Sequence, residues 1–158
     1  LHKTWVHEGG IATPMVVHWP DGIKDRNAFR NMPAHVIDIA PTMLELAGGD
    51  PMELKGNAEA PGISLVPFLK KDVISERPPI FFHHEKKNAL RDGDWKITTI
   101  EEDGQWELYD LSKDRGECNN LAEQNPEKLK ELVALWEAQR MEIIKQVGGS
   151  DQSPMEKE

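Results

Sequence analysis

The spacing of hydrophobic positions changes at Pro78-Pro79. Before this pair the apolar residues come in short runs broken by Gly and Pro, and after it they alternate every second residue. Asp92-Gly93 and Asp103-Gly104 separate alternating segments, and Asp-Gly between such segments is a strong hairpin signal. We therefore predict an antiparallel meander of four strands over residues 80–82, 88–92, 95–100 and 106–111.

A long helix is predicted after the meander. Asn125 can cap it, Pro126 fits its first turn, and Glu127 lies at the positive end of its dipole. Gly148-Gly149 should end it, and residues 150–158 are predicted to be a disordered tail. Trp95, Trp106 and Trp136 should lie in the core, and the apolar face predicted to pack on the sheet consists of Leu129, Leu132, Val133, Trp136, Ile143, Ile144 and Val147.

The first half of the chain suggests elements of an α/β layer. The apolar residues 15–19, bounded by Pro14 and Pro20, predict a buried strand. Asp38 should cap a helix over residues 39–47, which Gly48 would end. A second, short helix is predicted over residues 64–70, with Ser64 as its cap.

Lys3 and Glu8 stand just before Gly9-Gly10 and the apolar run. Loops at strand edges often carry sites, and paired glycines allow close approach of a ligand or chain. The alternative is a tight turn with a solvated lysine. The local pattern leaves both interpretations open.

Four blocks in a fixed order resemble the sulfatases, in particular their bacterial arylsulfatase branch. They are KxxxxEGGIxxP from Lys3, the D-x-x-PT-x-L-x-LAG pattern from Asp38, G-x-SL-x-P-x-L from Gly62, and ELYDL-x-x-D-x-x-E-x-x-NLA from Glu107. The resemblance extends from Lys3 to about Val147. It implies an α+β fold: residues 1–74 form the end of the large α/β sulfatase domain, and residues 75–149 form a smaller four-stranded antiparallel sheet packed on the long C-terminal helix. Because the chain opens on Leu1, we expect a C-terminal fragment of a hydrolase of the alkaline-phosphatase superfamily.

The resemblance also implies site residues. Lys3 matches the family's catalytic lysine, which contacts the sulfate oxygens near the leaving group, while Glu8 should shape the loop as a hydrogen-bond acceptor. His84 and Glu85 align with a substrate-facing EHEGN loop, although Lys86 and Lys87 replace its Gly and Asn, as expected for a plain surface turn. His7 and Ala12 also depart from the family's usual Tyr and Arg.

The parent enzyme is expected to use a formylglycine nucleophile and Ca²⁺ or Mg²⁺. Cys118 is not followed by Pro-x-Arg, so it is not the formylglycine precursor, and the family's metal-binding acids precede Lys3. The fragment alone should therefore bind no cofactor or metal and be inactive. His83 and His84 are adjacent on extended chain and point to opposite faces, which argues against a shared metal.

The amino-acid composition limits the classes of molecule that the chain is expected to bind. A net charge of −9 argues against nucleic acid and anionic membranes, and the single cysteine excludes an internal disulfide. The expected substrate is a sulfate ester, aryl or carbohydrate, and a periplasmic or secreted parent is plausible. Oligomeric state stays open. Two alternatives remain, namely a related phosphonate or phosphate ester hydrolase and a non-catalytic binding module.

Overall fold

The chain forms two compact units in a computed structural model that describes residues 3–25, 27–52, 62–71, 77–101 and 104–146. The sheet unit comprises Leu1–Thr13 and Pro79–Glu158, and the helical unit comprises Pro14–Pro78. The helical unit is therefore inserted into the sequence of the sheet unit. The predicted boundaries at residues 74 and 149 refer to the domains of the parent and stay predictions.

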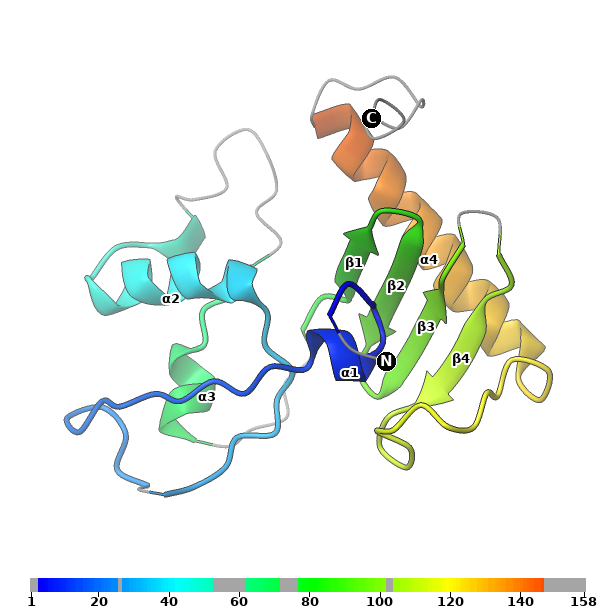
Figure 1. Ribbon diagram of the computed structural model, residues 1–158. Helices are drawn as coiled ribbons and strands as arrows, with labels where there is room; N and C mark the ends of the chain where they lie inside the picture. The colour runs from blue at the N-terminus through cyan, green and yellow to red at the C-terminus, as the bar shows by residue number, and fades with distance from the viewer. Residues whose placement is uncertain (1–2, 26, 53–61, 72–76, 102–103, 147–158) are drawn as a thin grey trace. The chain divides into compact units, whose positions relative to one another are not determined.

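The sheet is a four-stranded antiparallel meander with the order β1-β2-β3-β4 (Figure 1). Its strands are β1 (Ile80–His84), β2 (Lys87–Asp92), β3 (Trp95–Thr99) and β4 (Glu107–Asp110). Gly93, at φ +57°, supplies the left-handed conformation that the tight β2–β3 turn requires. The predicted meander is confirmed, whereas Asp103 of the second predicted turn lies outside the described residues.

Helix α4 (Pro126–Gln146) packs on one face of this sheet. The strand register aligns Leu90, Ile97 and Leu108 in one row, and Leu132 of α4 completes a fully buried cluster with them. Trp95, Trp106 and Trp136 pack against this cluster, as predicted. The core of the sheet unit therefore lies between the meander and α4.

The C-terminal end of α4 does not contribute to that core. Ile143 is 43% exposed, so the prediction that it packs on the sheet is wrong. A helix of 21 residues is about 31 Å long, whereas strands of four to six residues extend at most about 20 Å. Figure 1 shows this end of α4 extending past the strands. Val147, the glycine pair and the predicted tail lie outside the described residues.

None of the helices in the described part of the chain combines the length and apolar character needed to cross a membrane.

The helical unit is organised around Asp38. It contains η1 (Val36–Asp38), α2 (Ile39–Leu46) and α3 (Val66–Lys70), and Gly48 at φ +85° follows the end of α2 as predicted. The predicted cap of α2 is wrong, because the buried Asp38 carboxylate does not bond the α2 amides. It accepts hydrogen bonds instead from the amides of His35 (2.7 Å) and Ile63 (3.0 Å) and pairs with Arg77 at 2.9 Å.

Residues 15–19 do not form the predicted buried strand. Val16 is 93% exposed, and these residues have no strand pairing. A buried strand needs a neighbouring strand to satisfy its backbone groups, and the described part of the helical unit contains none. Trp19 is half-buried, with Lys70 Nζ 5.8 Å from its ring centroid.

Candidate functional site

Residues 5–8, called the N-terminal segment below, cover the face of the sheet opposite α4. Val6, His7 and Glu8 are buried there, and the one-turn helix α1 (Glu8–Ile11) follows (Figure 1). The reason lies in the alternation of β3: Ile97 faces α4, so Lys96 points to the other face. A lysine at that position needs carboxylates, and the N-terminal segment supplies one of them.

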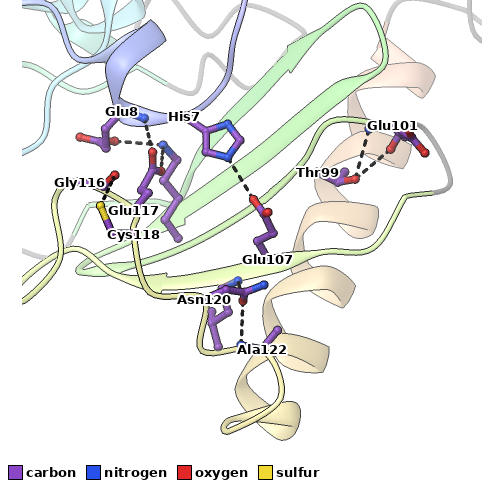
Figure 2. Close-up of polar contacts among 12 residues, drawn as sticks. His7, Glu8, Thr99, Glu101, Glu107, Gly116, Glu117, Cys118, Asn120 and Ala122 are labelled. Atoms are coloured by element: carbon purple, nitrogen blue, oxygen red, sulfur yellow. Dashed lines mark hydrogen bonds and ion pairs between the residues drawn. The ribbon is translucent and has the colours of Figure 1, made fainter. Parts of the chain in front are cut away.

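Lys96 is enclosed between two carboxylates. Its ammonium is fully buried and donates to Glu8 Oε1 at 3.1 Å. Its Nζ also forms an ion pair with Glu117 Oε1 at 2.7 Å, but the angles at these two atoms do not suit a hydrogen bond. The two glutamates are also linked directly: the backbone amide of Glu8 donates to Glu117 Oε2 at 2.6 Å (Figure 2). We call Glu8, Lys96 and Glu117 the charge clamp.

Two arginines lie beside the charge clamp. Arg115 Nη2 is 3.5 Å and Arg91 Nη1 is 4.0 Å from Glu8 Oε2. Glu8 therefore accepts a hydrogen bond, as expected, and also forms ion pairs that the sequence does not predict. These contacts tie the N-terminal segment to β2, β3 and the loop after β4.

His7 makes a second attachment to the sheet. Its Nε2 lies 3.0 Å from Glu107 Oε2 on β4 (Figure 2), while its buried Nδ1 has no hydrogen-bond partner among the described residues. The neighbouring Tyr109 is buried. Burial, followed by the negative charge of Glu107, raises the pKa of the Tyr109 phenol well above its ordinary value.

Lys3 is exposed and lies just outside this anchored segment. It has no ion pair or hydrogen bond with any of the residues that the structure describes. Thr4, which follows it, has φ 76°, a backbone conformation that non-glycine residues adopt at a cost of about 1–3 kcal/mol. The contacts of the next four residues hold that conformation, so Lys3 is presented at the edge of a fixed segment.

His84 and Glu85 lie where β1 turns into β2. His84 pairs in register with Lys87, and both belong to the sheet face that the N-terminal segment covers. Lys87 Nζ lies 5.7 Å from the ring centroid of Trp5 and donates to Glu85 Oε2 at 2.6 Å. That hydrogen bond lowers the pKa of the exposed Glu85 carboxyl below its ordinary value. Through Trp5, the turn carrying His84 and Glu85 is connected to the segment that presents Lys3.

His83 belongs to the other sheet face, so it does not join His84. Its Nδ1 lies 2.6 Å from Asn88 Oδ1. The adjacent histidines thus diverge, as extended geometry predicts.

The described residues do not fit the metal and nucleophile that the family resemblance implies. No three side chains of His, Cys, Asp or Glu in the described ranges are grouped to hold a metal ion. Cys118 is exposed, its amide bonds to Asp114, and its sequence lacks the Pro-x-Arg of the modification motif.

The sequence alone does not indicate a functional role for Lys96, and it marks Glu117 only as part of the motif that begins at Glu107. The available signal was a lysine among alternating apolar positions of a strand, which usually marks a solvated face. Nothing near it indicates that residues 88 positions earlier cover this face.

Comparisons with known proteins identify the family of the chain. Residues 1–146 match the family model described as N-sulphoglucosamine sulphohydrolase, C-terminal. An uncharacterized sulfatase of Schizosaccharomyces pombe is 32% identical over 86% of this chain and 26% of its own length, and arylsulfatase K of Mus musculus is 34% identical over 80% and 24%. A protein solved in complex with its substrate D-glucosamine-2-N,6-O-disulfate is 26% identical, with a TM-score of 0.54 over 77% of this chain and 25% of its own.

The chain spans about a quarter of the length of the curated relatives it matches. The family match extends over both compact units, and the solved relative is similar in fold with 26% sequence identity. The chain belongs to the sulfatases, within the family of N-sulphoglucosamine sulphohydrolase C-terminal domains.

Proposed function

We propose that this chain is the C-terminal part of an arylsulfatase-type sulfuric ester hydrolase and that Lys3 contacts the sulfate of its substrate. One observation carries the proposal: an exposed lysine, without a partner among the described residues, lies two positions before a segment that is attached to the sheet by several contacts. A fixed cation is suited to binding an anion, because little reorganisation is needed when the anion arrives.

The chemistry assigned to Lys3 is electrostatic. When the S–O bond of a sulfate ester breaks, negative charge develops on the ester oxygen. A compact ammonium placed near that oxygen stabilises the charge more in the transition state than in the bound substrate, which raises turnover. The nucleophile belongs to the parent and lies outside the residues described.

We further propose that His84 and Glu85 contact the organic part of the substrate. Glu85 carries a charge like that of sulfate, so it suits a hydroxyl or ammonium group better than the sulfate itself. The family model is named after an enzyme that acts on N-sulphoglucosamine, and the substrate of the solved relative is a disulfated glucosamine. These similarities favour a sulfated amino sugar over an aryl sulfate.

The first test is Lys3→Ala in the full-length parent. Loss of one donor at a developing charge should lower turnover of a sulfate ester by about two to three orders of magnitude, with little effect on folding. Lys3→Arg should recover little, since a planar guanidinium does not reproduce a compact ammonium. Lys130→Ala, at an exposed lysine of α4, is the matched control and should leave turnover unchanged.

The substrate class is tested on the same enzyme. Glucosamine 6-sulfate, an aryl sulfate and a phosphonate monoester are compared by kcat/KM. Preference for the phosphonate ester would contradict a sulfatase, and preference for the aryl sulfate would contradict only the amino-sugar assignment. Near-normal turnover of Lys3→Ala would remove the role of Lys3.

A further inference from the structure

We propose that Lys96 and Glu117 are positioning residues for Lys3, acting through Glu8 and the backbone of residues 4–8. This inference rests on the proposed function of Lys3. The charge clamp would set where the lysine stands, so that its effect on turnover depends on two residues at least 93 positions away in sequence.

The contacts fix residue 8 in two ways. Glu117 accepts from the Glu8 amide at 2.6 Å, and Lys96 donates to the Glu8 carboxylate at 3.1 Å. Backbone and side chain of one residue are therefore held together. Glu117 itself has φ 54°, a conformation that costs free energy in a non-glycine residue and that these contacts help to maintain.

Further contacts extend this hold toward Lys3. His7 bonds to Glu107, and Lys87 lies over the ring of Trp5. Only Thr4 then separates Lys3 from the attached residues. A displacement of residue 8 is thus transmitted along a short segment rather than absorbed by a flexible loop.

The charges explain why the clamp is sensitive. Glu8 and Glu117 have side chains that are 9% and 3% exposed, and both face the same ammonium. Without Lys96 these two buried carboxylates would repel each other, with Arg115 and Arg91 reaching Glu8 only at 3.5 and 4.0 Å. Of the two carboxylates, Glu8 belongs to the N-terminal segment and Glu117 to the loop after β4. We expect the repulsion to displace the N-terminal segment from the sheet.

The test is a double-mutant cycle in the full-length parent. Lys96→Met/Glu117→Gln removes one charge of each sign; glutamine keeps the length of glutamate, and methionine is one atom shorter than lysine. The double variant is made in both the wild-type and the Lys3→Ala background. If the pair acts through Lys3, kcat for a sulfate ester should fall about ten- to a hundredfold in the wild-type background, because small misplacements have effects of that size. In the Lys3→Ala background the same change should alter kcat less than about twofold.

The matched control is the buried ion pair of the helical unit. Arg77→Met/Asp38→Asn also removes one charge of each sign, from side chains 6% and 0% exposed at 2.9 Å. Any loss of kcat that it causes should be the same in both backgrounds. Circular dichroism checks that each variant is folded, and Glu117→Gln alone replaces the double variant in the cycle if that variant does not fold.

The outcomes separate the two proposals. Equal losses from the clamp variant in both backgrounds, with Lys3→Ala itself strongly impaired, would overturn the positioning role and leave the function of Lys3 intact. Normal turnover of Lys3→Ala would overturn the function of Lys3, and the positioning role with it.

Discussion

Tyr109 is the only tyrosine of the chain, and its buried phenol lies on the sheet face that the N-terminal segment covers. Burial and the charge of Glu107 raise its pKa, so the folded protein keeps a proton that the unfolded chain loses near pH 10. Above that pH the unfolded state binds fewer protons than the folded state. The free energy of unfolding should therefore decrease as pH rises beyond about 10.

Ultraviolet absorbance of the tyrosinate tests this at one residue, because no second tyrosine contributes. The folded chain should show no ionisation at pH values where the same chain in guanidinium is fully ionised. Tyr109→Phe should lack the tyrosinate signal and reduce the loss of stability at alkaline pH. Ionisation of the folded wild type near pH 10 would contradict the effect assigned to burial.

At the scale of residues, the sequence motifs indicate which residues are candidates for the site, but not which distant residues contact them. The sequence singled out Lys3, Glu8, His84 and Glu85 and predicted the acceptor role that Glu8 has. The roles of Lys3, His84 and Glu85 stay predictions. Lys96 was missed because its function depends on a contact between distant segments, which no local spacing encodes.

At the scale of elements, local signals were sufficient for the meander and the start of α4. Alternation and the Asp92-Gly93 pair predict the strands and the β2–β3 turn, and Asn125-Pro126-Glu127 predicts where α4 begins. Helical periodicity indicates which residues share a face but not how far the partner surface extends. For this reason Leu132 packs on the sheet as predicted whereas Ile143 does not.

This difference along α4 predicts two distinct stabilities. Leu132→Ala should lower the free energy of unfolding by about 2–5 kcal/mol, because it leaves a cavity in a fully buried cluster. Ile143→Ala, on the same helix, should change it by no more than about 0.5 kcal/mol. Urea unfolding followed by circular dichroism measures both, and similar losses would show that the end of α4 is packed.

At the scale of the whole molecule, exposed apolar side chains are concentrated in one unit. Of the twelve large hydrophobic residues that are exposed in the described ranges, nine belong to the helical unit, with Val16 at 93% and Phe29 at 88%. Met15, Val16 and Val17 of the apolar run belong to this exposed set, contrary to the buried strand that the sequence predicts. Apolar residues bounded by prolines indicate a buried strand only where neighbouring strands are present to pair with it.

Such exposure predicts that the chain self-associates, since large apolar areas in water favour association. Sedimentation velocity should show a weight-average mass that increases with concentration. Val16→Ser combined with Phe29→Ser should reduce this increase. The matched control, Met141→Ser combined with Ile143→Ser in the sheet unit, should leave it unchanged. A monomer at all concentrations would contradict the prediction.

The covering of the sheet by the N-terminal segment also has a consequence for folding order. The meander and α4 form through contacts between segments that are neighbours in sequence. Lys96 and Glu8, in contrast, are 88 positions apart in the sequence, and the whole helical unit is encoded between them. Closing so long a loop has a larger entropic cost than closing a hairpin, and contacts of this range form slowly. During synthesis the N-terminal segment is made before the sheet and has no surface to bind until β3 and the loop carrying Glu117 have been made. The segment that presents Lys3 is therefore translated before the strand that it covers and can dock only after Glu117 has been made.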